Sequence, residues 1–280
     1  MTSFDPPPSE VRRIVDGALS EDLGVLGDIT SIACIAEDAH AQAHFVAREE
    51  GVLAGTAPAA EVFRQLDATL AVTWNDADGA SLVPGTCLGT VSGSLRSILT
   101  GERCALNFLQ HCSGVASLTR RYVRAARGNA RILDTRKTLP GLRALQKAAV
   151  RAGGGFNHRD SLSDAVLIKD NHLAALGITK AVDRARARWP NRVVEVECDT
   201  LEQVAEARDA LPDVVLVDNM RPEDVKEAVA ILAGAAKVEV SGGVTLDTVG
   251  AYAESGADYI SVGALTHSVR ALDIGLDVVG

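Results

Sequence analysis

The sequence predicts an α/β fold in which a (β/α) barrel follows an N-terminal α+β region. From Ile132 onward, short apolar runs alternate with helical stretches, a pattern typical of parallel βαβ units. Before that point, strand-like runs cluster together with helices beside them. The second region has no GxGxxG motif after its first apolar run, which favours a barrel over a doubly wound sheet.

The first region begins with a Pro-rich arm at residues 1–9. A helix follows over residues 10–23, where the apolar side chains have helical spacing. A turn at residues 27–30 leads into a second short segment. The remaining elements are strands at residues 43–49, 51–55, 70–74 and 86–95, and a helix at residues 57–66.

A long helical segment over residues 97–127 is interpreted as the join between the two regions, with an interruption near Ser113-Gly114. We expect a first domain at residues 1–107 and a catalytic barrel domain at residues 108–267. The tail, residues 268–280, is a candidate to return to the first domain. In the second region, the expected strands begin near Ile132, Ala165, Val193, Val214, Val238 and Tyr259, and the expected helices cover residues 142–152, 178–188, 201–210, 222–232 and 246–254.

The composition excludes several classes of protein. Hydrophobic residues make up 47% of the 280 residues, but no apolar run reaches the length of about 18 residues needed for a membrane span. The N-terminus lacks the pattern of a secretory signal. The five cysteines form no CxxC pair, so we expect reduced thiols in a cytoplasmic protein, with Cys104 and Cys112 as small core residues. A net charge of −9 argues against nucleic acid and anionic membranes as partners.

The stretch from Ile132 to His172 has the opposite charge from the rest of the chain. It holds seven basic and four acidic residues, a net charge of +3, which predicts a site for a small, highly charged anion. Three of the basic residues are spaced by four and fit a solvated helix face: Arg143, Lys147 and Arg151. Others lie at the ends of apolar runs or in a Gly-rich loop, and we expect these to be functional: Arg136, Lys137, His158, Arg159 and Lys169.

Every apolar run of the second region stops in polar residues or glycines. In a barrel these carboxyl ends of the strands carry the chemistry. One such ending would be an ordinary helix cap, but six together outline a site. The endings are Asp134 to Lys137, Lys169 to His172, Glu197 and Asp199, Asp218 to Met220, Ser241 to Gly243, and Gly263-Ala264.

These endings divide by chemistry. Arginine forks such as Arg136 suit planar carboxylate or phosphate groups. Glu197 and Asp218 would be costly in a dry site without a cation, and Mg²⁺ bound together with phosphate is the natural candidate. The backbone N–H groups of the last two endings suit a phosphate cradle. The sequence therefore predicts a ligand with carboxylate, phosphate and Mg²⁺.

Several motifs are similar to those of the quinolinate phosphoribosyltransferase family. The long stretch from Asp134 to His172, DTRKTLPGLRALQKAAVRAGGGFNHRDSLSDAVLIKDNH, carries most of the resemblance. Shorter segments agree with it: GERCALNFLQHCSG, VEVE, LVDNM, EVSGGV and ADYISVGALTHS. The similarity extends from about Glu21 to the C-terminus.

The resemblance implies an N-terminal α+β sandwich joined to an incomplete α/β barrel. It also implies a reaction of NAD biosynthesis, in which quinolinate and phosphoribosyl pyrophosphate (PRPP) give nicotinate mononucleotide, pyrophosphate and CO₂ with Mg²⁺. The expected oligomer is a homodimer, and the family includes hexamers.

The resemblance also implies roles for individual residues. Quinolinate would be bound by Arg136, His158, Arg159 and Lys169, together with Arg103 of the partner subunit, although spacing alone also allows a surface ion pair of Arg103 with Glu102. Lys137 would bind the pyrophosphate donor, while Glu197 and Asp218 match the acidic pair near the ribose and Mg²⁺, as direct or indirect ligands. The expected phosphate and substrate contacts are Thr135, Ser241, Gly242, Gly243, Val262, Gly263, Ala264 and His267, with a helix-terminal role open for His267. The expected catalytic residues are Lys137, Lys169, Glu197 and Asp218.

Alternative functions fit part of the sequence. Lys169 at a strand end is also the arrangement of a Schiff-base aldolase, but that leaves the acidic pair without a role. A molybdenum-transport accessory protein or a regulatory binding module on the same fold would be non-enzymatic. A nicotinate-using transferase would need fewer cations, because nicotinate has one carboxylate.

Overall fold

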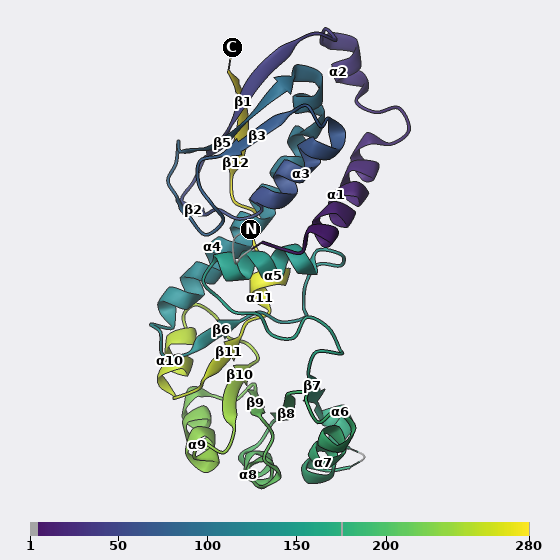
Figure 1. The fold of residues 1–280 in the computed structure, drawn as a ribbon. Helices are drawn as coiled ribbons and strands as arrows, with labels where there is room; N and C mark the ends of the chain where they lie inside the picture. Colours follow the sequence, from purple (N-terminus) through teal and green to yellow (C-terminus); the bar gives the residue numbers. More distant parts are fainter. Residues whose placement is uncertain (1–4, 175, 280) are drawn as a thin grey trace. The chain divides into compact units, whose positions relative to one another are not determined.

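The computed structural model describes residues 5–174 and 176–279. They divide into two compact units (Figure 1). The first holds the residues up to Arg120, Thr138–Gly154 and the residues from Leu265, and the second holds Arg121–Lys137 and Gly155–Ala264. The domain limits expected at residues 107 and 267 stay predictions, because a compact unit need not be an independent domain.

The first unit is an α+β layer, as predicted, on an antiparallel sheet with strand order β12-β1-β5-β3. Buried residues alternate along β1, and Phe45 on this strand stacks on Trp74 of β3 at a centroid distance of 4.8 Å. Its other aromatic neighbour is Phe63 of α3, at 6.1 Å, so α3 covers this face of the sheet. The elements of this unit are α1 (Pro8–Leu23), α2 (Ile29–Cys34), β1 (His40–Ala47), β2 (Gly51–Val52), α3 (Thr56–Leu66), β3 (Ala71–Trp74), β4 (Ser81–Leu82), β5 (Cys87–Ser94), α5 (Arg143–Ala152) and β12 (Ile274–Val279). Two helices have residues in both units, α4 (Leu95–Ala125) and α11 (Ala264–His267).

The C-terminal strand β12 belongs to the sheet of the first unit. It pairs antiparallel with β1, with Phe45 opposite Leu276. The carbonyl of Ile274 accepts a hydrogen bond from Gln110 Nε2 at 2.7 Å. The strand is therefore held by backbone pairing on one side and by a side chain of α4 at its beginning.

Helix α4 is continuous, so the interruption expected near Ser113-Gly114 is wrong. Glycine is required at position 114 for a different reason, since an added Cβ would lie 2.2 Å from the backbone oxygen of Arg270. Gly114 thus permits a close approach of the tail to the helix. The expected core positions Cys104 and Cys112 on this helix are buried.

Lys147 is a second correction. Charge spacing predicts it on a solvated face of α5, yet it is 2% exposed, and seven of the ten residues of this helix are buried. A spacing of four residues describes one face of a helix but does not determine whether that face meets solvent. The tertiary packing around α5 decides this.

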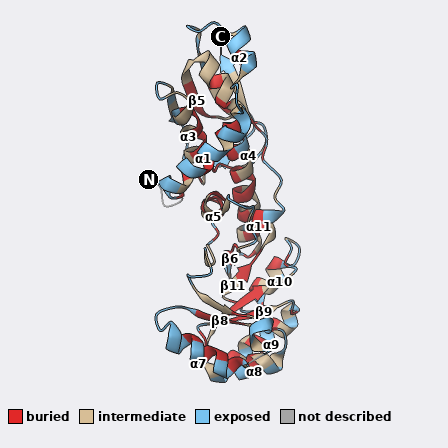
Figure 2. Cartoon of the chain, turned by 90° about the vertical axis from the view of Figure 1, so that its right-hand side faces the viewer, coloured by how far each residue is buried: buried red, intermediate tan, exposed pale blue. Residues whose placement is uncertain are grey.

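The second unit holds a parallel sheet with strand order β6-β11-β10-β9-β8-β7 in the described part of the chain. The first two strands along the chain, β6 and β7, are its edges, so the barrel is incomplete, as expected. Helices α7, α8 and α9 bury one side and expose the other (Figure 2). The elements are β6 (Arg131–Leu133), β7 (Val166–Ile168), α6 (Asp170–Leu173), α7 (Ile178–Arg188), β8 (Val194–Cys198), α8 (Leu201–Ala210), β9 (Val214–Asp218), α9 (Pro222–Leu232), β10 (Lys237–Ser241), α10 (Val249–Glu254) and β11 (Tyr259–Ser261).

Local sequence explains where these helices begin. Thr200 accepts a hydrogen bond from the backbone of Gln203 and forms a capping box with it at the start of α8. Pro222 occupies the first turn of α9, where its missing N–H is not needed. Across residues 5–174 and 176–279, no helix combines the length and apolar character that crossing a membrane requires.

The close approach at Gly114 gives a test of the fold. In Gly114→Ala the new methyl group would collide with the Arg270 carbonyl, and we expect a loss of about 1–3 kcal/mol in the free energy of unfolding. The matched control is Gly17→Ala on α1, where nothing lies within 4 Å of the added Cβ, and it should gain about 0.5–1 kcal/mol. Thermal denaturation followed by circular dichroism measures both. Equal stability of Gly114→Ala and the parent chain would contradict the contact.

Candidate active site

A cavity of about 280 Å³ opens at the carboxyl ends of the strands of the second unit. It is lined by cations, carboxylates, small polar groups and two leucines. These residues are Thr135, Arg136, Lys137, His158, Arg159, Leu167, Lys169, Glu197, Leu216, Asp218, Glu239, Ser241 and Ser261.

The strands present alternate side chains to this cavity. The parallel register pairs Glu197 of β8 with Leu216 of β9, and Leu216 with Glu239 of β10. The next cavity residues along β9 and β10, Asp218 and Ser241, are also register partners. Side chains on a strand alternate between its two faces, so residues two apart on one strand point into the same cavity. The register therefore lines up two rows of side chains, one with Glu197, Leu216 and Glu239 and one with Asp218 and Ser241.

Asp134 holds two loops of the site together. Its side chain is fully buried and accepts hydrogen bonds from the backbone N–H of His158 at 2.9 Å and from Asn157 Nδ2 at 2.5 Å. A backbone bridge between Leu133 and Phe156 adds to this connection. The segments that carry Arg136 and Arg159 therefore run beside each other at the edge strand β6.

A buried cluster of His158, Glu195 and Glu239 lies in the sheet interior. His158 Nε2 is 3.1 Å from Glu195 Oε2 and 3.5 Å from Glu239 Oε1. The two carboxylate side chains are only 3% exposed. Ser261 Oγ donates a hydrogen bond to Glu239, whereas Glu195 Oε1 has no hydrogen-bond partner among the described residues.

Burial changes the acidity of two groups here. Desolvation, with a further effect of the Glu195 carboxylate, raises the pKa of Glu239 to about 8, although His158 and Ser261 oppose the shift. Desolvation, and then repulsion from Arg136, lower the pKa of the Arg159 guanidinium. Arg159 nevertheless stays a cation, since a guanidinium does not lose its proton in proteins.

Lys169 and Glu197 form an ion pair in the cavity. The Nζ of Lys169 donates to Glu197 Oε2. The lysine side chain is 45% exposed and that of Glu197 is 11% exposed. The pair joins a cation from the end of β7 to a carboxylate from β8, so a ligand carboxylate that binds Lys169 competes with Glu197.

The ends of β9 and β10 interlock through Asn219. Its side-chain amide donates to Asp218 Oδ2 at 2.6 Å, and its backbone N–H donates to the Ser241 carbonyl at 2.9 Å. Gly242 has a φ of +91°, and a Cβ there would lie 2.2 Å from Asn219 Oδ1. Only glycine allows this close approach with a left-handed backbone.

The structure brings nine of the expected site residues together in the cavity lining: Thr135, Arg136, Lys137, His158, Arg159, Lys169, Glu197, Asp218 and Ser241. Gly242 and Gly243 continue the chain directly after this lining, and Val262, Gly263 and Ala264 follow β11. Arg103 and His267 belong to the first unit, so their part in the site stays a proposal.

The sequence interpretation missed several residues that build the site, among them Asp134 as a support, Glu195, Glu239 and Ser261. A signal was present for the two glutamates, because each stands at an inward position of an otherwise apolar strand, in VEVE and VEVS. An acidic residue at such a position is costly unless it has a partner. No comparable signal marks Ser261.

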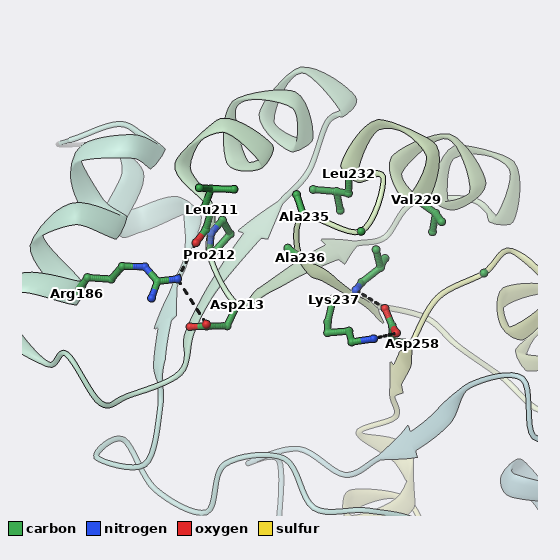
Figure 3. A pocket seen from close by; sticks show the side chains of 13 residues that line it. Arg186, Leu211, Pro212, Asp213, Val229, Leu232, Ala235, Ala236, Lys237 and Asp258 are labelled. Carbon is green, nitrogen blue, oxygen red and sulfur yellow. Dashed lines mark hydrogen bonds and ion pairs between the residues drawn. The ribbon is translucent and has the colours of Figure 1, made fainter.

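A larger cavity, about 450 Å³, lies at the amino ends of the strands (Figure 3). Its charged groups are paired with each other, Arg186 with Asp213 at 3.5 Å and Lys237 with Asp258 at 2.7 Å. Asp213 also accepts a hydrogen bond from the backbone N–H of Val194, at the start of β8. Asp258 accepts one from the backbone N–H of Val238, near the start of β10. These carboxylates close the amino ends of the sheet, the side that serves stability in such barrels.

The raised pKa of Glu239 predicts a stability effect. Because the folded pKa of about 8 exceeds the unfolded value of 4.5, the native state binds more protons between these values. The free energy of unfolding should therefore fall as pH rises through this window. Glu239→Gln removes the titration, and its melting temperature should fall less between about pH 5 and about pH 8. The exposed Glu227→Gln is the control, and parallel curves for Glu239→Gln and the parent chain would contradict the assignment.

Two family models match nearly the whole chain. The quinolinate phosphoribosyl transferase N-terminal domain matches residues 28–113, and the C-terminal domain matches residues 115–277. The chain is 45% identical to the nicotinate-nucleotide pyrophosphorylase [carboxylating] of Mycobacterium leprae, with 98% of each chain covered. It is 42% identical to the probable nicotinate-nucleotide pyrophosphorylase [carboxylating] of Bacillus subtilis, with 96% of this chain and 93% of the relative covered.

A solved structure agrees with these relatives. The nicotinate-nucleotide pyrophosphorylase from Francisella tularensis superposes with a TM-score of 0.93 at 42% identity, and the match covers 100% of this chain and 99% of that one. The similarity thus includes both units and every strand that contributes to the cavity. The chain belongs to the quinolinate phosphoribosyltransferase family.

Proposed function

We propose that the cavity of the second unit is the place where this chain carries out the reaction of its family. The chain has nicotinate-nucleotide pyrophosphorylase (carboxylating) activity in NAD biosynthesis. It joins quinolinate to the phosphoribosyl group of PRPP and releases pyrophosphate and CO₂. The observation that carries the location is that one cavity is lined by four cationic side chains and by carboxylates from adjacent strands.

Quinolinate is a dianion, and the cationic part of the lining fits it. Arg136 and Arg159 present guanidinium forks, which bind planar carboxylates through two parallel hydrogen bonds. Lys169 adds a third cation, with His158 beside it. Holding both carboxylates fixes the ring and aims its nitrogen, so these residues act by orientation rather than as nucleophiles.

PRPP takes the opposite side of the proposed site. Lys137 binds the pyrophosphate group, and Glu197 and Asp218 face the ribose. The 5′-phosphate sits on the backbone N–H groups after β10 and β11, where barrels often bind phosphate. The residues assigned to this role are Ser241, Gly242, Gly243, Val262, Gly263, Ala264 and His267, and Thr135 supports the loop by accepting a hydrogen bond from the Lys137 N–H.

The acidic pair suits Mg²⁺. Glu197 and Asp218 come from adjacent strands and supply hard oxygen ligands beside the proposed pyrophosphate position. Mg²⁺ commonly takes one or two carboxylates together with substrate phosphates and water, so contact can be direct or through water. When bound, the ion would neutralise charge on the departing pyrophosphate.

The residues of the chain support each change in bonding. Pyrophosphate leaves the anomeric carbon with the bonding electron pair, and Lys137 balances its charge. Glu197 and Asp218 stabilise the oxocarbenium-like ribose electrostatically. The ring nitrogen then forms the new C–N bond. The pyridinium accepts the electron pair of the breaking C–C bond as CO₂ leaves, and a proton from water replaces CO₂ on the ring carbon.

A direct assay tests the function. With PRPP and Mg²⁺, quinolinate should give nicotinate mononucleotide and CO₂ in equal amounts, while nicotinate should give no product because it leaves one carboxylate-binding group unused. Product from nicotinate would refute the two-carboxylate site. Well-folded protein that turns over neither acid would refute the enzymatic assignment in favour of a binding module on the same fold.

We assign Arg103 to the site of the neighbouring copy in a homodimer. Arg103 lies on α4 in the first unit and is exposed, whereas the cavity belongs to the second unit. A fourth quinolinate-binding cation from a second copy would make the dimer necessary for full activity. Higher assemblies of such dimers, including hexamers, would preserve the shared site.

Mixed dimers test this assignment. Arg103→Ala and Lys137→Ala should each be nearly inactive alone, but co-expression should restore about a quarter of the parent activity. Half of the dimers are then mixed, and each mixed dimer has one intact site. The control is the double variant carrying both substitutions on one chain, which should restore nothing when co-expressed with either single variant. Absence of any rescue would contradict the shared site.

A further inference from the structure

Both ring nitrogens of His158 are already occupied by the protein. The backbone N–H of Arg159 donates to Nδ1 at 2.7 Å, so Nδ1 is unprotonated and acts as an acceptor. Nε2 faces two carboxyl groups, the nearer being Glu195 at 3.1 Å. Because Nδ1 is unprotonated, the imidazole carries its proton on Nε2, which is placed to donate it to the Glu195 carboxylate. The contacts therefore select the neutral Nε2–H form of the ring.

Glu195 is placed behind the cavity rather than in it. His158 and Glu239 line the cavity, while Glu195 is 3% exposed and is absent from the lining in the described part of the chain. One of its oxygens faces the imidazole, and leaving the other buried without a partner among the described residues is costly. An apolar residue at this strand position would avoid that cost, so we look for a role of the carboxylate beyond stability.

The geometry points to Glu195 as a positioning residue that holds His158 in one tautomer and, through the Nδ1 contact, fixes the backbone of Arg159 for quinolinate binding. This inference rests on the proposed function. The carboxylate contacts of quinolinate then fall to the arginines and the lysine, and His158 presents a ring surface beside the substrate. A carboxylate that orients an imidazole through one nitrogen is a recurring arrangement in enzymes.

These contacts connect the end of β6, strand β8 and the loop that carries His158. Asp134, directly after β6, accepts a hydrogen bond from the His158 backbone N–H, and Glu195 of β8 contacts Nε2. Nδ1 accepts a hydrogen bond from the backbone N–H of Arg159, the next residue of the loop. The loop after Phe156 has no regular secondary structure of its own. Hydrogen bonds to side chains therefore hold this loop in place, where a strand would have been held by backbone pairing with its neighbours.

A metal site is the competing explanation for the same residues. The potential ligand atoms of His158, Glu195 and Glu239 lie within 4.8 Å of one another. The protein already supplies hydrogen bonds for the imidazole and for Glu239, through Ser261. This argues that the three residues form a hydrogen-bonded cluster rather than a metal site. Elemental analysis for bound metal decides between these two explanations.

The experiment compares Glu195→Ala with Glu195→Gln in the full chain. Glutamine keeps an oxygen that can accept from Nε2–H, whereas alanine removes it. We expect Glu195→Ala to raise the KM for quinolinate about tenfold with little change in the KM for PRPP, and Glu195→Gln to stay within about threefold of the parent protein. A general loss of folding would affect both substrates, and the exposed Glu227→Ala serves as a control.

Nuclear magnetic resonance of ¹⁵N-labelled histidine provides a readout that does not depend on turnover. The His158 signals are identified by their loss in His158→Gln. The parent protein and Glu195→Gln should show a protonated Nε2 and an unprotonated Nδ1, and Glu195→Ala should lose this single form.

Four results would overturn the inference. They are a proton on Nδ1 of His158 in the parent protein, an unchanged KM for quinolinate in Glu195→Ala, equal impairment of Glu195→Gln and Glu195→Ala, and a stoichiometric bound metal that Glu195→Ala releases. If the parent protein showed no turnover of quinolinate, the proposed function would fail, while the tautomer measurement would still stand or fall separately.

Discussion

The parallel register of strands β6 to β11 is the constraint on which the site depends. Parallel strands place all their carboxyl ends on one side, so residues far apart in sequence, such as Lys169 and Ser241, line one cavity. The same register determines which side chains face the cavity. Glu197 and Glu239 share a row with Leu216, and a shift of one residue would turn these groups toward the helices.

The protein itself supplies partners to the cationic part of the site. Lys169 pairs with Glu197, and the arginine loops are tied down by the buried Asp134. A substrate carboxylate that binds Lys169 must therefore compete with Glu197. This arrangement favours ligands that offer two carboxylates or a phosphate in the correct geometry, because weaker anions do not compensate for the lost pairs.

Much of the site could be predicted from sequence because the groups that line it stand at strand ends. Polar endings such as Asp218 and Ser241 are visible wherever an apolar run stops. The supporting residues are harder to recognise. Glu195 and Glu239 sit inside apolar runs, and only the register shows that both meet the same imidazole. Lys147 shows the opposite error, since helical spacing suggested solvent where the structure has a buried side chain.

The sequence by itself determined the alternation of strands and helices in the second unit, the polar strand ends and the excess of positive charge between Ile132 and His172, because periodicity and charge are local properties of a chain. Tertiary structure alone decided that α4 runs unbroken past Gly114, that β12 joins β1, and that Glu195 reaches His158. These features depend on contacts between residues distant in sequence, and their free energies exist only once the chain has brought both partners together.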